Sequence, residues 1–151
     1  MDFRDLMLLI HLIGVGTWLG ANVVQMVAPP LAAAQGKETS AGWMRMGAGF
    51  GRRIYIPVGV IVLLSGVALV LLSDGVYTFG SLFVTIGFAV VIIAALLGSF
   101  VFTPGAEKAA EAIESGDERK IASTTGRLAR FGALDTLLLL FAMAVMIIRW
   151  Q

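Results

Sequence analysis

Residues 10–30 read IHLIGVGTWLGANVVQMVAPP, and this stretch decides the fold class. It is long and apolar enough to cross a bilayer as a helix, because about 20 residues span a hydrocarbon core about 30 Å thick. It nevertheless contains polar side chains, among them His11, which is the one histidine of the sequence. Polar groups are costly in hydrocarbon, so these side chains should face the interior of a helix bundle.

The overall composition is also that of a membrane protein. Of the 151 residues, 58% are hydrophobic and 14% are charged, whereas soluble domains average about 45–50% apolar and about 25% charged residues. The formal net charge of +1 gives no basic field for nucleic acid. The sequence has no cysteine, which excludes disulfides and thiolate chemistry. It also has no motif for hydrolysis or phosphoryl transfer, so a binding or transport role is favoured over an enzyme.

Four apolar runs predict four transmembrane helices, over residues 6–31, 54–72, 79–102 and 131–148. Lipid leaves no water for backbone groups, so each run should be helical. The predicted architecture is therefore all-α, an up-down bundle that forms one domain over residues 1–151.

The connections between these runs differ in length and charge. Residues 73–78 form a short turn with an Asp-Gly pair, whereas residues 35–53 and 103–130 are longer and charged. The second long connection is rich in helix formers. Pro104 marks its start, Gly116 should break it, and Asp117 should cap the helix that follows. We therefore expect helices three and four to extend past the membrane as a cytoplasmic hairpin.

Basic residues are distributed unequally between the two ends of the predicted bundle. Arg4 and Arg149 lie at one end, and nine basic residues lie in the two long connections. The nine are Lys37, Arg45, Arg52, Arg53, Lys108, Arg119, Lys120, Arg127 and Arg130. Basic residues near helix ends favour the cytoplasmic side. This pattern predicts that both long connections are cytoplasmic and that both termini are outside.

The polar residues of the first helix fall on one stripe. A helix turns about 100° per residue, so residues spaced by 7, 4 and 3 nearly superpose. The stripe consists of His11, Trp18, Asn22 and Gln25. Gly16 and Gly20 form a GxxxG pair on a neighbouring face, where another helix can approach closely.

A first candidate site lies on the outer side of the bundle. His11 is about 8 Å below the outer end of helix one, counted at 1.5 Å per residue. Met7 is one turn away on the same face, and Met143 and Met146 of helix four are predicted at a similar depth. Imidazole and thioether suit Cu(I) or the axial positions of haem b. Alternatively, the histidine bonds a carbonyl or hydroxyl across helices and the methionines fill gaps in the core.

A second candidate cluster surrounds Asp135, about one turn inside helix four. Its predicted neighbours are Asn22, Gln25, Arg53, Arg130 and Thr136. An acid at this depth relays a proton, binds a cation, or pairs with an arginine to fix helix packing. The last interpretation is favoured here, because an arginine partner is available and the site lies near the membrane interface.

The sequence resembles a group of small bacterial four-helix membrane proteins of unknown function. These are related to copper-resistance D-type domains and more distantly to HemJ-type protoporphyrinogen oxidases. The resemblance covers the whole chain and is carried by His11, Trp18 to Gly20, Pro29, Pro30, Pro57, Ser65 and Gly66, with Ala21 at a position where these families often have glycine. It implies a bacterial inner-membrane protein in which His11 matches a histidine linked to haem or copper handling. This chain has no second histidine, so a bis-histidine haem within one subunit is excluded.

These patterns leave three hypotheses for function. The first is a cytoplasmic-membrane binding or accessory protein whose polar interior holds a small ligand, with haem or copper as the candidate. The second is a small oligomeric transporter or channel subunit that uses Asp135. The third is a structural subunit of a larger membrane complex. In each case the lipid bilayer is the immediate partner, joined by further copies of the chain or by another membrane protein.

Overall fold

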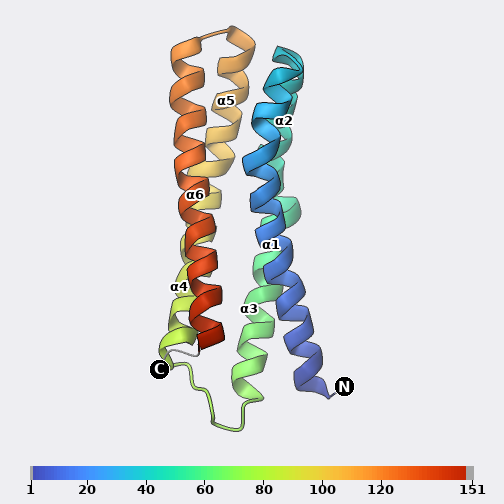
Figure 1. Ribbon diagram of the computed structural model, residues 1–151, viewed down its shortest axis with the longest axis vertical. Helices are drawn as coiled ribbons and strands as arrows, with labels where there is room; N and C mark the ends of the chain where they lie inside the picture. Colours follow the sequence, from blue (N-terminus) through green and yellow to red (C-terminus); the bar gives the residue numbers. More distant parts are fainter. Residues whose placement is uncertain (1, 149–151) are drawn as a thin grey trace.

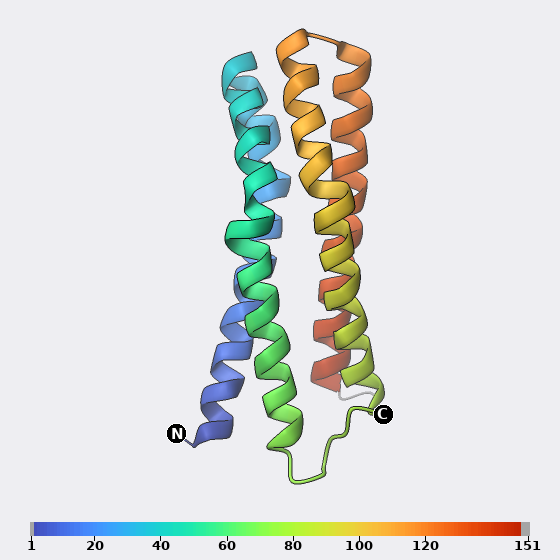
Figure 2. The same ribbon diagram turned by 180° about the vertical axis from the view of Figure 1, so that it is seen from behind.

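The computed structural model describes residues 2–148, which fold into helices arranged as four long rods. The first rod is α1 (Phe3–Ala34), and the second joins α2 (Lys37–Phe50), η1 (Gly51–Tyr55) and α3 (Ile56–Leu71). The third joins α4 (Leu82–Leu97), η2 (Gly98–Phe102) and α5 (Thr103–Ser115), and the fourth is α6 (Glu118–Ile148). The α1–α2 and α5–α6 turns lie at one end of the molecule, and the connection between α3 and α4 lies at the other (Figures 1 and 2).

Each rod is long and apolar enough to cross a membrane. The four rods contain 32, 35, 34 and 31 residues, which corresponds to about 47–52 Å of helix at 1.5 Å per residue. A hydrocarbon core is only about 30 Å thick, so the rods are long enough to extend well beyond it. Within the described residues, the all-helical class and the four predicted spans are confirmed. Arg149, which the sequence placed at one end of the bundle, lies outside the described residues.

Several predicted boundaries were wrong. Residues 37–50 of the first long connection form helix α2, and α4 begins at Leu82 rather than at residue 79. Helix α1 begins earlier than predicted, because the Asp2 and Asp5 side chains each accept from the other's backbone N–H in a capping box. The same helix continues through Pro29 and Pro30 to Ala34.

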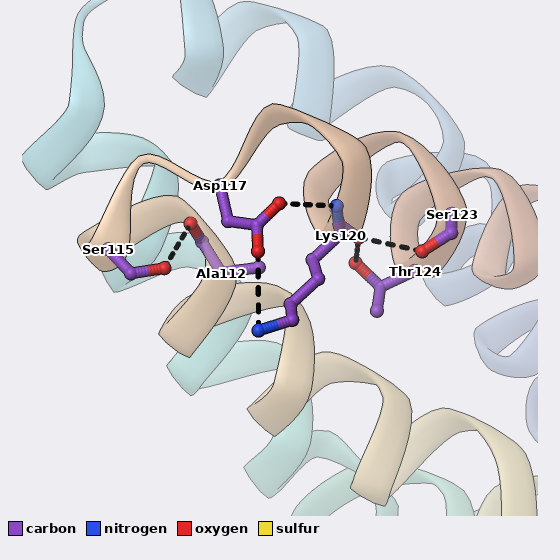
Figure 3. A network of polar contacts seen from close by, with 6 residues as sticks. All are labelled: Ala112, Ser115, Asp117, Lys120, Ser123 and Thr124. Carbon is purple, nitrogen blue, oxygen red and sulfur yellow. Dashed lines mark hydrogen bonds and ion pairs between the residues drawn. The ribbon is translucent and has the colours of Figure 1, made fainter.

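The turn between α5 and α6 forms as the sequence predicted. Gly116 ends α5 in a left-handed conformation with φ of 73°, which suits a residue without a Cβ. The Asp117 carboxylate accepts from the Lys120 backbone N–H at 3.1 Å and pairs with its ammonium at 3.2 Å, as Figure 3 shows. The backbone hydrogen bond from Lys120, followed by the bond from its side chain, lowers the pKa of Asp117 below its ordinary value. The capped turn therefore holds two long helices side by side.

Two separate cores stabilise the rods. The membrane core consists of Val15, Trp18, Val58, Val62 and Leu139. The alanine core consists of Ala41, Met44, Ala109, Ala110 and Ile113, which join α2 to α5. Small side chains allow the backbones of α2 and α5 to approach closely, so the charged part of the bundle has an apolar interior of its own.

The second and third rods each contain one wide π-helical turn. In η1 the Ile56 backbone N–H donates to the Gly51 carbonyl, and in η2 the Thr103 backbone N–H donates to the Gly98 carbonyl. A proline lies two residues after the end of each turn, at Pro57 and Pro104. Proline has no N–H, and its ring clashes with the carbonyl four residues earlier. The helix therefore widens into a π-helical turn just before each proline. The prolines therefore reshape these rods without ending them.

Candidate functional site: a buried polar network at Asp135

The polar stripe of α1 faces the interior of the bundle. His11, Trp18 and Asn22 are only 8%, 4% and 7% exposed, and Gln25 is half-buried. The GxxxG residues lie elsewhere on α1: a Cβ added to Gly16 or Gly20 would meet no atom within 4 Å. The helical period thus separates a polar inner face from an open outer face on one helix.

Asp135 of α6 is the acidic end of a network that starts on this stripe. Its side chain is only 4% exposed. Its Oδ2 accepts from Asn22 Nδ2 at 2.8 Å and from Trp18 Nε1 at 3.4 Å. These two donors tie α1 to α6 through the middle of the bundle.

The network continues from Asn22 to the second rod. The Tyr55 hydroxyl donates to Asn22 Oδ1 at 2.8 Å, and Gln25 Nε2 donates to the Tyr55 hydroxyl oxygen at 2.6 Å. Each donor from Gln25 through Tyr55 and Asn22 therefore points toward Asp135. A chain of aligned hydrogen bonds is mutually reinforcing, and its direction stabilises negative charge on the carboxyl group.

Tyr55 was not predicted to belong to a site. It is the last residue of η1, so the π-helical turn before Pro57 positions its hydroxyl. Its ring also meets Trp18 edge-on, with ring centroids 6.4 Å apart. The sequence indicated a role for Tyr55 only indirectly. Asn22 and Gln25 needed polar partners from another helix, and Tyr55 carries a hydroxyl group at the start of the second apolar run.

The favoured arginine partner of Asp135 is not found, and that prediction was wrong. Within residues 2–148, ion pairs join Arg45 to Glu114 and Lys120 to Asp117, and none involves Asp135. The Arg53 guanidinium lies near Gly49 on its own rod, and Arg130 is exposed. Long basic side chains at the edge of a membrane extend toward water, which leaves the carboxyl group to neutral donors.

Asp135 lies inside the apolar part of the bundle, about one turn past Phe131, where the fourth apolar run begins. It precedes the described end of α6 by 13 residues, or about 20 Å of helix. Its partner Trp18 is 15 residues from the start of α1 and belongs to the membrane core. Both fall within about 30 Å of the end opposite the charged turns, so a hydrocarbon layer at that end encloses the network.

His11 forms a second buried polar contact, closer than Asp135 to the end of the bundle where α1 begins. Its Nδ1 lies 3.1 Å from the Val62 carbonyl oxygen and 3.1 Å from Ser65 Oγ, both on α3. The carbonyl only accepts, so Nδ1 carries the proton, and neutral imidazole then has an unprotonated Nε2. This is the cross-helix bond expected of a lone buried histidine. It is also the arrangement that prepares Nε2 as a metal ligand.

The predicted methionine partners of His11 lie against different neighbours. Met143 is half-buried against the membrane core. Met146 packs on α4, where its Cε would be 2.5 Å from a Cβ at Gly87. Met7 is half-buried. Among the described residues, no group of three or more His, Cys, Asp or Glu side chains could hold a metal ion. The structure therefore gives His11 partners on α3, and the methionines stay predicted partners.

Comparison with known proteins adds no relative to this picture. No protein-family model, no curated protein and no solved structure matches the chain at a significant level. The resemblance carried by His11 and by Trp18 to Gly20 accordingly stays a prediction from the sequence. The candidate site is defined by its own geometry.

Proposed function

We propose that the protein is a small membrane transporter or channel subunit in which Asp135 takes up and releases a proton. One observation carries this proposal: a carboxyl group buried in the membrane core receives side-chain hydrogen bonds from Asn22 and Trp18, and no cation among the described residues balances it. Intramembrane acids without a fixed counter-charge are typical of proton and ion routes.

The direction of the network supports the same role. Gln25 donates to Tyr55, Tyr55 donates to Asn22, and Asn22 donates to Asp135, so these hydrogen bonds run in one direction and favour the ionised carboxylate. Protonation neutralises the carboxyl group without requiring any of these donors to leave. The network thus gives Asp135 two accessible states in one geometry, which a proton-carrying group requires.

The proposal is tested by proton flux into liposomes that contain the purified protein and a trapped pH-sensitive dye. A potassium diffusion potential drives the flux. Asp135→Asn should abolish it while the melting temperature in detergent stays unchanged or rises, because the amide accepts the same hydrogen bond and carries no charge to desolvate. Asp74→Asn, the same change in the exposed turn after α3, is the matched control and should retain full flux. Equal flux for wild type and Asp135→Asn would refute the proposal.

The orientation of the protein belongs to the same proposal. We place it in the inner membrane of a bacterium as an up-down bundle, with the charged α1–α2 and α5–α6 ends in the cytoplasm and both termini outside. The nine basic residues of the predicted connections favour this side. The alanine core supports it further, because it allows the helices to continue beyond the membrane as a packed extension.

A single bundle of four helices encloses a proton route poorly, and association with a further helix would enclose it better. Gly16 and Gly20 lie on an open face of α1, where no described atom is within 4 Å of an added Cβ. Such a face suits close contact with a helix of a second copy or of a partner membrane protein. Crosslinking in native membranes that yields monomer alone would argue against this arrangement.

The second candidate function is an accessory protein that binds haem b or Cu(I) at His11. The hydrogen bond from Nδ1 to the Val62 carbonyl favours it, because it leaves Nε2 as a ligand. Protein purified after growth with both haem and copper supplied should then show a Soret band or bound copper, and His11→Leu should remove it. Absence of both from the wild type would exclude this candidate.

A further inference from the structure

A groove with basic and apolar walls lies on the surface where the third rod packs against the fourth. It has a volume of about 60 Å³ and is lined by residues of η2, α5 and α6. Helices α5 and α6 lie side by side (Figures 1 and 2). Its lining includes Phe100, Val101, Lys108, Thr124, Arg127 and Leu128. The groove therefore combines two cations with an apolar section and contains no acidic residue in its lining.

Both cations are available to bind an anion. Neither Lys108 nor Arg127 takes part in the ion pairs of residues 2–148, and both are exposed. The Arg127 guanidinium lies 5.8 Å from the centre of the Phe131 ring, which holds the side chain at the wall of the groove. Guanidinium and ammonium groups are the usual protein ligands of phosphate.

The groove lies at the depth of lipid headgroups. Lys108 is six residues past Phe102, where the third apolar run ends, and Arg127 is four residues before Phe131, where the fourth begins. At 1.5 Å per residue both lie about 6–9 Å beyond the apolar layer. Phe100, which is 73% exposed, and Val101 continue the same groove into that layer.

The floor of the groove is rigid, because α5 and α6 approach closely beneath it. A Cβ on Gly105 would lie 2.8 Å from Leu128 Cδ2. This glycine allows the close contact, and the contact holds the two basic walls at a fixed separation. Close packing of α5 against α6 therefore forms the floor of the groove.

We propose that this groove binds one anionic phospholipid from the adjacent leaflet. Lys108 and Arg127 hold the headgroup phosphate, and an acyl chain lies over Phe100 and Val101. The assignment rests on the chain spanning the membrane but not on proton transport by Asp135. A free phosphate ion would use the two cations alone, whereas a phospholipid uses the apolar section as well.

The test is native mass spectrometry of the protein titrated with phosphatidylglycerol or phosphatidylcholine. Wild type should retain phosphatidylglycerol preferentially. The double variant Lys108→Ser/Arg127→Gln should bind it about thirtyfold more weakly, at about a 1 kcal/mol loss for each basic residue. Lys37→Ser/Arg119→Gln removes two exposed charges outside the groove lining and should leave binding unchanged. Charge-preserving Lys108→Arg/Arg127→Lys should retain binding, which separates lost charge from lost fold.

Three results would overturn the proposal. The first is equal retention of phosphatidylglycerol by wild type and the groove double variant. The second is equal retention of the two lipids by wild type. The third is displacement of phosphatidylglycerol by millimolar inorganic phosphate, which would assign the two cations to a free anion. Equal proton flux in wild type and Asp135→Asn, which would refute the transport proposal, affects none of these readings, so the two proposals fail separately.

Discussion

The Asn22 side-chain amide of α1 lies 2.8 Å from the Asp135 carboxylate of α6, across 113 positions of sequence. The same Asn22 accepts from the Tyr55 hydroxyl of the second rod. One amide therefore joins three rods and donates to the buried carboxyl group of Asp135. Asn22 therefore links the rods and also contacts the carboxyl group that we propose to carry the proton.

Removing that amide should destabilise the protein strongly. Asn22→Leu leaves Asp135 with Trp18 as its remaining donor, at 3.4 Å, and leaves the Tyr55 hydroxyl without its acceptor. We expect a loss of about 3 kcal/mol in the free energy of unfolding in detergent, because a buried carboxyl group and a buried hydroxyl group each lose a hydrogen-bond partner.

Two further variants make this measurement specific. Val23→Leu changes an exposed residue of the same helix and should stay within about 0.5 kcal/mol of wild type. Adding Asp135→Asn to Asn22→Leu should recover part of the lost stability, because the two residues are in contact. Additive losses in the double variant would show that the pair is not coupled.

The fold was predictable because bilayer thickness and hydrophobicity constrain it directly. Four apolar runs require four helices, whatever their side chains pack against. The boundaries were less predictable. Residues 37–50 look like a charged link, yet Ala41 and Met44 bury a helical face against Ala109 of α5. That face forms only when a distant helix is present, so hydropathy alone does not reveal it.

The sequence predicted which helix face carries the site residues, but it did not predict which of the neighbouring residues hydrogen-bond to Asp135. The 3.6-residue period placed Trp18 and Asn22 together on the inner side of α1. The partner of Asp135 was predicted wrongly, since proximity to arginines in sequence says nothing about where long side chains extend. Tyr55 was missed because its orientation depends on the π-helical turn before Pro57, a local distortion with no hydropathy signature.

Two glycines of α1 should respond oppositely to the same substitution. A Cβ on Gly14 would lie 2.7 Å from Val62 Cγ2 on α3, whereas a Cβ on Gly16 would meet nothing within 4 Å. Gly14→Ala should destabilise the protein by about 1–3 kcal/mol through overpacking against a stiff β-branched side chain. In the monomer, Gly16→Ala should be neutral or stabilise the protein by up to about 1 kcal/mol, since alanine favours the helix.

Chemical denaturation of both variants in one detergent measures this difference. A loss of stability in Gly16→Ala that equals that of Gly14→Ala would show that the outer face of α1 is occupied in solution. Crosslinking of the same sample would then distinguish a second copy of the chain from a different partner.

The α5–α6 turn should weaken in acid through Asp117. Hydrogen bonds from Lys120 hold the pKa of Asp117 below its ordinary value of 3.8. A carboxylate with a lowered pKa in the folded state contributes stability at pH values above the unfolded pKa, and this contribution is lost as the pH falls through the folded pKa. Asp117→Ala should therefore lower the melting temperature at pH 6, and the difference from wild type should disappear in acid below the folded pKa.

Asp117→Asn provides the control for charge. Asparagine caps a helix as well as aspartate does, so this variant should keep most of the stability at pH 6 and show no such change with pH. An identical pH dependence of the melting temperature in wild type and Asp117→Ala would contradict the assignment of this titration to the cap.

The orientation in the membrane is tested by single cysteines at exposed positions of the two ends. The native chain contains no cysteine, so each variant reports one site. Lys37 and Glu114 lie at the end with the charged turns, and Val76 lies in the connection between α3 and α4, 68% exposed. In intact cells, an impermeant thiol reagent should label the cysteine at 76 and spare those at 37 and 114. All three should react after the cells are permeabilised. Labelling of 37 and 114 with protection of 76 would reverse the proposed orientation, because the nine basic residues would then have crossed the membrane against the usual charge bias.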